Sequence, residues 1–320
     1  MKLGIIFDVH QTAYWKVLID KITKGEIDKG IILGDLFDTH RVGSALPTKE
    51  AIENAKEIIA FKKQYPDKVD LIWGNHDYQY YRDVPYNNFQ NKYHLEIQKL
   101  FEENKDLFRV AVQYDKWLIS HAGISKGWMD RCKINSLEEI EEFWDKYIPV
   151  FDIDYADDFP YYNGSTLKSS PIWIRPHYLL ENPWKPYQIV GHTGFGYHNK
   201  PFALKPFKED GAIIFGDNFT QSNYLQIDSN ETVEGKNIDE ALKIIKKEDK
   251  EFNNKKSVEG EYFKKLRDKY HLTKEDLEVC LFFVGIERRA SEEHNCEFDF
   301  YESLEEHCKS RMEEKEKKEK

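Results

Sequence analysis

The first part of the chain alternates short apolar runs with amphipathic segments. Residues 3–7, 30–33 and 69–73 are almost wholly apolar, which is typical of strands buried on both faces. Residues 12–22 repeat apolar positions at helical spacing, and a second such segment begins at about Thr48, its expected N-cap. Strands that alternate with helices in this way predict a parallel sheet of the α/β class.

Further along the chain the pattern predicts a hairpin and another helix. Residues 109–114 and 117–120 read as two strands of a β-hairpin, because only a short polar connection separates them. Ser136 and Glu139 have the spacing of a capping box at the start of a helix that continues to about Tyr147.

The middle of the chain lacks a clear period. Residues 149–186 contain many Pro, Tyr and Trp, and we expect them to form a long surface loop or cap. Beyond them, strands are predicted at residues 187–190, 212–215 and 224–227.

The composition divides the chain into three parts. After about Gly235 the sequence becomes rich in Lys and Glu, with apolar positions at helical spacing, which predicts a helical extension over residues 236–308. Residues 309–320 mix charges without an apolar face, and we expect them to be disordered. Residues 1–235 then form the main α/β domain.

Composition and charge narrow the class of protein. Of 320 residues, 40% are apolar and 14% aromatic, which indicates a globular protein with a large core. The formal net charge of −11 disfavours nucleic acids and anionic membranes as partners. No apolar run approaches the roughly 20 residues that cross a bilayer. The chain has four cysteines that show no paired spacing: Cys132, Cys280, Cys296 and Cys308. This indicates reduced thiols and a cytoplasmic protein.

Polar clusters begin where apolar strands stop. In an open α/β sheet the carboxyl ends of the strands share one edge, so these clusters are expected to converge. They contain Asp, His and Asn, a donor set suited to Mn, Fe, Zn or Mg. Asp35 is expected to bridge two divalent ions. The glycines before Asp35, Asn75 and His192 are expected to allow sharp turns that point the next side chain into the site. The clusters are Asp8-Val9-His10, Gly34-Asp35-Leu36-Phe37-Asp38, Gly74-Asn75-His76-Asp77, His121-Ala122-Gly123 and Gly191-His192-Thr193.

These motifs, in this order, resemble those of the calcineurin-like metallophosphoesterases, most of all the bacterial-type phosphoprotein-phosphatase branch. That branch shows D-x-H, G-D-x-x-D, G-N-H-[DE], H-[AG]-G and a late His, and the resemblance spans about residues 3–227. It implies a four-layer α/β/β/α sandwich of two mixed sheets with a dimetal centre. Residues 1–235 would be the catalytic domain and the helical extension an addition to it.

The resemblance also implies a role for each site residue. Asp8 and His10 would hold the first metal, and Asp35 would bridge both metals. The second metal would be held by Asn75, His121 and His192. His76 would be the proton donor to the leaving group, oriented by Asp38.

The expected activity is hydrolysis of phosphomonoesters, as in protein Ser/Thr phosphatases. Two metals about 3.5–4 Å apart would clamp the phosphoryl oxygens and supply a bridging hydroxide for in-line attack. Manganese is the first choice, with Fe, Zn or Mg as alternatives. A histidine is the side chain best suited to protonate the leaving oxygen near neutral pH. The partner would be a phosphorylated protein or a small phosphoester.

The sequence departs from this family where arginines usually grip phosphate. Thr39 and His40 replace the Arg-Gly that normally follows the second Asp, and Trp73 replaces an Arg before Gly74. Two other arginines are candidates for the phosphate, together with Asn75: Arg175, in a tryptophan-x-arginine segment, and Arg41.

Alternatives from other classes stay open. Similar motifs occur in hydrolases of nucleotide phosphoanhydrides, such as diadenosine polyphosphates. A non-catalytic binding scaffold is a second alternative, disfavoured because Asp35, Asn75 and His76 are all present. A nuclease is disfavoured because Gly194 stands where nucleases of this family have a second histidine.

Overall fold

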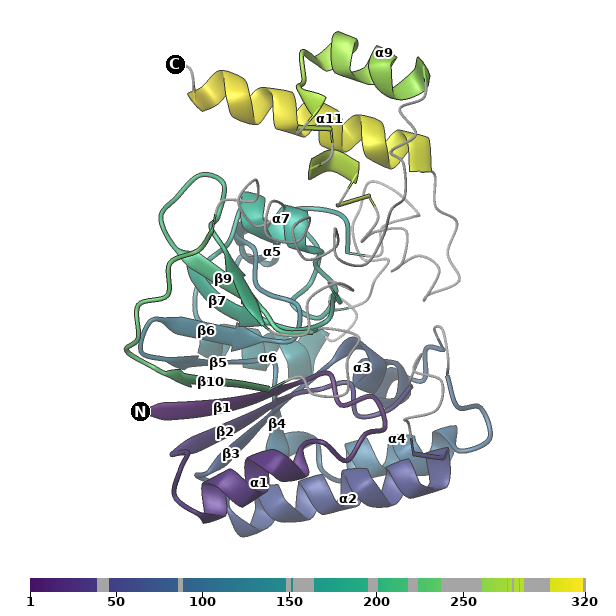
Figure 1. Ribbon diagram of the computed structural model, residues 1–320. Coiled ribbons are helices and arrows are strands. Elements are labelled where there is room, and N and C mark those ends of the chain that lie inside the picture. The colour runs from purple at the N-terminus through teal and green to yellow at the C-terminus, as the bar shows by residue number, and fades with distance from the viewer. Residues whose placement is uncertain are drawn as a thin grey trace, which may run out of the picture.

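Two mixed sheets pack against each other, and helices cover their outer faces (Figure 1). The expected α/β/β/α sandwich is therefore confirmed. The computed structural model describes residues 1–38, 46–85, 89–147, 151, 164–194, 201–217, 224–236, 261–274, 276–277, 279–281, 283–284 and 300–318. The candidate Arg41 and most of the stretch between residues 237 and 299 lie outside this part.

The first sheet is built on the three predicted apolar runs. Its strands follow the order β10-β1-β2-β3-β4, with β1 to β4 parallel and β10 antiparallel to β1. This sheet is therefore mixed, because the predicted strand at residues 224–227 joins its edge. The bounds are β1 Lys2–Phe7, β2 Lys29–Leu33, β3 Val69–Ile72, β4 Phe108–Arg109 and β10 Tyr224–Asp228.

The second sheet contains the predicted hairpin. Its order is β5-β6-β7-β9-β8, with β5 and β6 antiparallel and β6, β7 and β9 parallel. The strand predicted at residues 109–114 is divided between the sheets, since Arg109 ends β4 and Ala111 begins β5. The sequence pattern missed β8. The bounds are β5 Ala111–Tyr114, β6 Trp117–Ser120, β7 Tyr187–Val190, β8 Phe202–Leu204 and β9 Ala212–Phe215.

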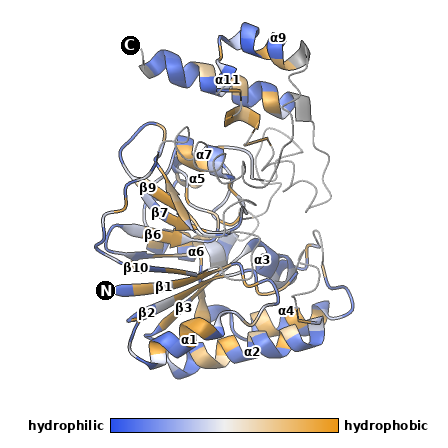
Figure 2. Ribbon diagram, viewed as in Figure 1, coloured by the Kyte–Doolittle hydropathy of each residue, from blue (hydrophilic) through white to orange (hydrophobic). Residues whose placement is uncertain are grey.

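Helices flank both sheets, and their polar outer surfaces contrast with the apolar strands (Figure 2). Next to the first sheet lie α1 Lys16–Thr23, α2 Thr48–Gln64, α3 Asn75–Arg82, α4 His94–Glu102 and the short 3-10 helix Lys105–Leu107. On the side of the second sheet lie α5 Lys126–Cys132, α6 Leu137–Tyr147 and α7 Pro176–Glu181. No helix in the described ranges is both long and apolar enough to cross a membrane.

Two predicted helix starts are tested by the hydrogen bonds. The Ser136 cap of α6 is confirmed, because the Glu139 N–H donates to the Ser136 hydroxyl over 3.2 Å. The Glu139 carboxylate accepts its bond of 2.7 Å from the N–H of Asn135, one residue before the N-cap, so the second half of the expected capping box is shifted by one residue. Thr48 is not the N-cap of α2. It is the first helical residue, and its hydroxyl donates to the Gln90 side chain over 2.8 Å.

The expected surface loop is partly a buried segment. Within its described residues, Ile172, Trp173, Ile174 and Arg175 are at most 2% exposed, and α7 follows directly. The side chains of Ile172, Trp173 and Ile174 pack in clusters with the second sheet and α5, so the lack of a period reflects burial on all sides.

The charged tail, residues 309–320, was expected to be disordered. Up to Lys318 it is instead helical, as the end of α11 Phe300–Lys318. Leu304 and Cys308 of this helix are buried in a cluster with Leu266 of α9 Glu261–Tyr270. The other buried members of the cluster are Leu272, Leu277, Cys280 and Val284. Arg311, 8% exposed, also forms an ion pair with Asp276 at 3.0 Å. The apolar anchors precede the charged end of the helix, which explains why the end alone shows no apolar face.

Candidate metal centre and active site

The polar clusters lie directly after β1, β2, β3, β6 and β7, as the sequence predicted. The packing of the sheets brings them to one place. Many of these residues adopt the left-handed backbone region, which is uncommon for non-glycine residues and concentrates at functional sites. The φ values are 42° for Asp8, 40° for His10, 50° for Asp35, 60° for Asp38 and 63° for His192.

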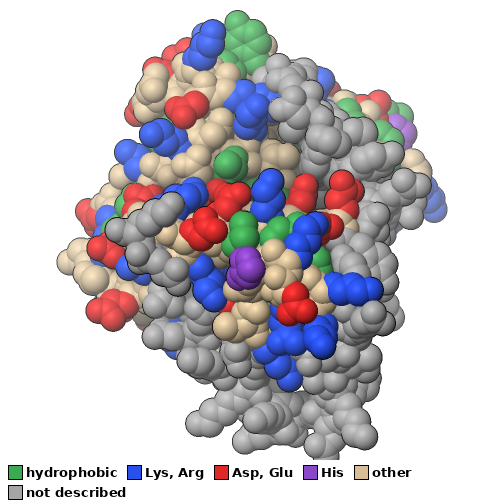
Figure 3. Space-filling view, turned by 90° about the horizontal axis from the view of Figure 1, so that it is seen from above, with side chains coloured by type: hydrophobic (Ala, Val, Ile, Leu, Met, Phe, Trp, Pro, Cys, Tyr) green, Lys and Arg blue, Asp and Glu red, His purple; other side chains and the backbone are tan. Residues whose placement is uncertain are grey.

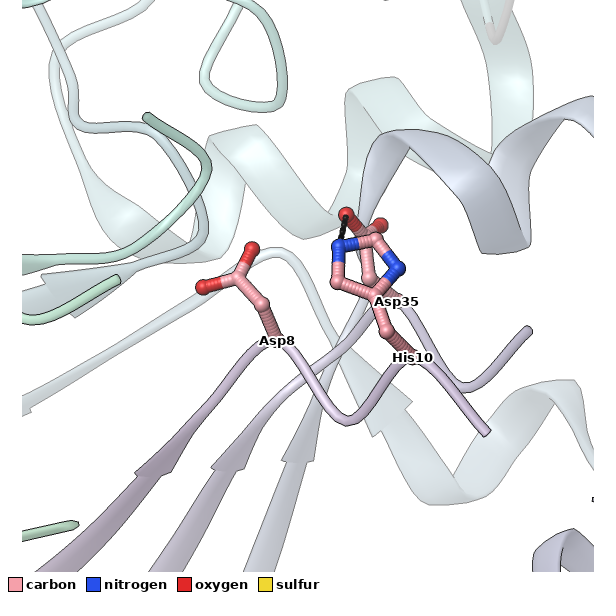
Figure 4. Close-up of side chains that lie close together, drawn as sticks. All are labelled: Asp8, His10 and Asp35. Atoms are coloured by element: carbon pink, nitrogen blue, oxygen red, sulfur yellow. Dashed lines mark ion pairs between the residues drawn. The ribbon is translucent and has the colours of Figure 1, made fainter. Parts of the chain in front are cut away.

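Asp35 lies between two histidines. Its Oδ2 is 3.7 Å from Nε2 of His10 and 3.4 Å from Nε2 of His121. Its Oδ1 accepts a hydrogen bond of 2.9 Å from the backbone N–H of His76. Ligand atoms of Asp8, His10 and Asp35 all lie within 4.8 Å of one another (Figure 4). One carboxylate thus faces donors on two sides, which is the arrangement of a bridging group.

A second group of donors meets at Asn75. Its Oδ1 is 2.8 Å from Nε2 of His121 and 2.8 Å from Nδ1 of His192. Asp8 is tied to the same region, since the backbone N–H of His192 donates to its two carboxylate oxygens over 2.9 and 3.1 Å. All six predicted metal ligands are therefore brought together.

Each of the three histidines is oriented by a backbone carbonyl. Nδ1 of His10 lies 3.2 Å from the Phe37 oxygen, and Nδ1 of His121 lies 2.8 Å from the Leu33 oxygen. Nε2 of His192 lies 3.2 Å from the Trp173 oxygen. A ring N–H that donates to a carbonyl leaves the other nitrogen as a lone pair, as metal-ligating histidines require.

The charge at the centre favours cations. Burial, with the nearby Asp8 and Asp77 carboxylates, raises the pKa of Asp35 well above its usual range. Burial lowers the pKa of His121 to about 3, so this imidazole is neutral and able to ligate. Crowded buried carboxylates beside neutral imidazoles and an amide oxygen fit divalent ions such as Mn²⁺, Fe²⁺ or Zn²⁺.

Asp77 is a positioning residue that sequence reasoning missed. Its carboxylate accepts N–H groups of Asp35 at 2.8 Å, Leu36 at 2.8 Å and Gly74 at 3.0 Å. It thereby joins the loop after β2 to the loop after β3. Burial raises its pKa to about 7. The sequence could have indicated this role, because Asp77 directly follows His76 in the motif Gly74-Asn75-His76-Asp77.

The glycine before Asn75 serves a different purpose from the one expected. The φ of Gly74 is −101°, so no left-handed turn is required there. A Cβ at this position would instead lie 2.1 Å from Oδ1 of Asp35. Of the glycines before Asp35, Asn75 and His192, only Gly34 has a positive φ, of 74°, and shows the expected turn. Close approach therefore explains Gly74, because the Asp35 carboxylate lies against it.

His76 and Asp38 form the expected pair. Nδ1 of His76 lies 3.2 Å from Oδ2 of Asp38, and both side chains are buried. Asp38 also accepts hydrogen bonds from Gln79 and from the Tyr80 hydroxyl. These two partners in α3 were not anticipated, and they hold the carboxylate that orients the imidazole.

Arg175 is brought beside the metal centre. It is 2% exposed, and its Nη1 donates to the Thr193 hydroxyl over 3.1 Å, next to His192. Its positive charge is close enough to contribute to the lowered pKa of His121.

Trp73, which stands where the resemblance implied an arginine, lies in an aromatic core. Its ring stacks on Phe108 at 4.5 Å, and on Tyr81 and Trp144 at 5.1 Å each, measured between centroids. It is 1% exposed and contributes packing between α3, β4 and α6.

The fold and this donor set define a metal-dependent phosphoester hydrolase. More specifically, the chain belongs to the calcineurin-like phosphoesterase family, whose model matches residues 1–218. No curated protein matches the chain at a significant level.

Several solved structures resemble this fold at low sequence identity. A cold-active protein-tyrosine phosphatase from a psychrophilic Shewanella species has a TM-score of 0.46 and 16% identity, covering 72% of this chain and 76% of its own. A protein serine/threonine phosphatase from Saccharomyces cerevisiae has a TM-score of 0.40 and 16% identity, covering 71% and 72%. A putative diadenosine tetraphosphatase has a TM-score of 0.35 and 14% identity, covering 74% and 94%.

Proposed function

We propose that the enzyme hydrolyses phosphomonoesters in the manner of protein Ser/Thr phosphatases, with two divalent ions and His76 as general acid. One observation carries this proposal. Asp35 faces His10 and His121 at 3.7 and 3.4 Å through one oxygen, while its other oxygen holds the His76 backbone at 2.9 Å. The same carboxylate therefore sets the distance between the metal ligands and the acid.

The residues divide into two ligand sets that share Asp35. Asp8 and His10 complete the first set, and Asn75, His121 and His192 complete the second. Manganese is the proposed ion at both places, since carboxylate, amide and imidazole donors suit it. When bound, the ions supply Lewis-acid stabilisation of the phosphoryl oxygens and an activated water.

His76 delivers the proton to the leaving oxygen. Asp38 accepts the Nδ1–H over 3.2 Å, so Nε2 is the nitrogen left to face the substrate. The charge of Asp38 stabilises the imidazolium form that serves as the acid. Gln79 and Tyr80 donate hydrogen bonds to Asp38 and so hold its carboxylate in place beside His76.

Arg175 and Asn75 are the proposed phosphate contacts among the described residues. A guanidinium binds two phosphate oxygens at once, which fits a monoester with its exposed terminal oxygens. A phosphorylated protein or a small phosphoester is the proposed substrate. The described cysteines Cys132, Cys280 and Cys308 are free thiols, which supports the cytoplasm as the compartment.

A substrate panel tests the proposal. Purified protein with added Mn²⁺ is assayed on an aryl monophosphate, phosphoserine and phosphotyrosine peptides, an aryl phosphodiester and a diadenosine polyphosphate. Monoesters are expected to be hydrolysed with the highest kcat/KM, and elemental analysis to find two metals per chain. Preference for the diadenosine compound or the diester would overturn the substrate class, and inactivity on all of them would favour a binding scaffold.

A further inference from the structure

The catalytic domain meets the helical extension where α7 lies below α11, and each side contributes a histidine to this junction (Figure 1). His177 of α7 and His307 of α11 are 8% and 3% exposed. Their ring centroids lie 4.5 Å apart, and the rings are nearly perpendicular, at 87°. Two buried imidazoles in contact across a junction make it sensitive to pH, because histidine ordinarily titrates near pH 6.5.

Apolar side chains surround His177 at the junction. Its ring makes edge contacts with Phe207 at 5.3 Å and with Phe283 of the extension at 5.0 Å, measured between centroids. Phe283 also belongs to the same buried cluster as Leu179 and Leu180 of α7. The extension is therefore attached to α7 through buried apolar surface, and the imidazole of His177 lies within that surface.

The ring of His177 is uncharged in this arrangement. Its Nδ1 is buried and has no hydrogen-bond partner among the described residues. Burial lowers the pKa of His177 well below its usual range, and the neighbouring His307, Arg311 and Lys208 lower it further. A cavity beside the two rings has a volume of only 10 Å³, about the least that holds one water. A charged ring would therefore be poorly hydrated as long as the junction is closed.

The charged groups that the catalytic domain places beside His177 are balanced. Glu181, four positions further along α7, pairs with Lys208 at 3.2 Å. The Glu181 carboxylate is therefore already engaged, and Lys208 disfavours a second positive charge on the neighbouring imidazole.

The charged groups of the extension are balanced as well. Arg311 pairs with Asp276 at 3.0 Å and with Glu314 at 3.1 Å, and Lys315 pairs with Asp276 at 2.6 Å. A proton on His177 would thus add a net positive charge to a junction whose described charges otherwise cancel. The other titratable groups that line the cavities beside His177 are the buried thiol of Cys280 and the exposed side chains of Glu313 and Lys317.

The outer surface on this side of the molecule does not supply a strong field of one sign. Seen from above, acidic and basic side chains are interspersed over the described surface (Figure 3). Exposed charges are also screened by salt. A pH response of the junction is therefore expected to arise from the buried imidazole and not from the surface charges.

We propose that mild acid releases the helical extension from α7, because docking requires an uncharged His177. Once the junction opens, water reaches the imidazole, so that opening is coupled to the uptake of one proton. The pKa of His177 is lowered in the docked form and ordinary in the open form. Docking is therefore strongest above about pH 6.5, and each pH unit below that value favours the open form about tenfold. The junction lies beside Arg175, which directly precedes α7, but the release does not depend on the proposed hydrolysis.

Hydrogen exchange measures the opening of the junction. Full-length protein with excess Mn²⁺ is labelled at several values between about pH 5 and about pH 8, with labelling times scaled to the intrinsic exchange rate at each pH. Mass spectrometry then gives the protection of each peptide. The protection of the α7 amides is expected to be constant above about pH 7 and to fall about tenfold per pH unit below about pH 6. Amides of α2, which lies against the first sheet, are the internal reference and should not show this slope.

Two variants assign the proton to His177. His177→Phe replaces one buried ring by another and removes the titrating nitrogen, so the protection of α7 should become independent of pH. His271→Asn is the matched control, because it removes an exposed histidine of the extension, and it should keep the wild-type slope. Asparagine is chosen because His271 has a φ of 52°, which asparagine tolerates. Both variants should match the wild type in the protection of α2, which shows that they fold.

Three outcomes would overturn the proposal. These are α7 protection that does not fall between about pH 6 and about pH 5, an equal slope in His177→Phe and the wild type, and an equal slope in α7 and α2. The last outcome would mean that acid unfolds the whole chain. The first and the last are decided by the wild-type protein alone, so the test holds even if His177→Phe does not fold.

Discussion

Oδ1 of Asn75 lies 2.8 Å from Nδ1 of His192, although 117 positions separate the two residues. Asn75 begins α3 after a strand of the first sheet, and His192 follows a strand of the second. The contact therefore exists only when the two sheets are packed together. Since Asn75 also meets His121 at 2.8 Å, the ligand set is a product of the whole sandwich and not of one local motif.

Replacing Asp35 by Asn should abolish turnover. The amide keeps the size of the side chain but removes the charge that lies between His10 and His121, so we expect a fall in kcat of about 10³-fold or more. The fold should survive, because the backbone N–H of Asp35 still donates to Asp77. Steady-state assays of an aryl phosphate with Mn²⁺ and elemental analysis measure both effects.

Asp20→Asn is the matched control, since Asp20 is an exposed helical residue paired only with Lys24 among the contacts described. It should keep wild-type kinetics and metal content. Activity of Asp35→Asn within about tenfold of wild type would show that Asp35 does not bridge metals.

His76→Asn should lower the rate according to the leaving group. Without the proton donor, alkyl phosphates are expected to lose about 10²–10⁴-fold in kcat, and a nitrophenyl phosphate much less. The measurement is a series of aryl and alkyl monophosphates of increasing leaving-group pKa. An equal loss across the series would mean that His76 does not act as the acid.

Arg175→Met should weaken phosphate binding and change the thermal stability of the fold only a little. Methionine keeps much of the buried volume but removes the guanidinium. We expect the Ki of inorganic phosphate and the KM of an aryl phosphate to rise about tenfold or more. Measurement of Tm separates the alternatives, because a purely structural arginine would lower Tm and leave the phosphate Ki unchanged.

The sequence predicted those parts of the fold in which a local pattern repeats. The apolar runs of β1, β2 and β3 and the cap that Ser136 places on α6 are local, and each appears where it was expected. The site motifs were also predictable, since each polar cluster follows a strand. Within each sheet, their convergence follows from the rule that the carboxyl ends of neighbouring strands share an edge. That the clusters of the two sheets meet depends on the packing of one sheet on the other, which the motifs do not encode.

The remaining features depend on contacts between distant residues. Nothing local shows that Trp73 stacks on Trp144, or that Arg311 in the charged tail pairs with Asp276 at 3.0 Å. The role of Asp77 was hidden for a similar reason, because its partners Asp35 and Leu36 lie in another loop. These features follow from packing, which the spacing of residues along one segment does not encode.

The metal-free protein should become less stable as the pH rises from about 4 to about 7. In the folded state the pKa of Asp77 is raised to about 7 from an ordinary value of 3.8, chiefly by burial, and that of Asp35 is also raised. Between these values the native state retains protons that the unfolded chain has released, so the free energy of unfolding falls with pH. The slope is up to about 1.4 kcal/mol per pH unit for each retained proton.

Metal binding should oppose this loss, because divalent ions compete with protons for the same carboxylates. Urea unfolding at several pH values, with EDTA or with Mn²⁺, should therefore show a difference in stability between the two forms that grows as the pH rises. Asp35→Asn removes one of the groups with a raised pKa and should flatten the decline of the metal-free protein. If the metal-free protein instead gains stability across this range, the buried carboxylates do not carry the excess negative charge on which the metal centre depends.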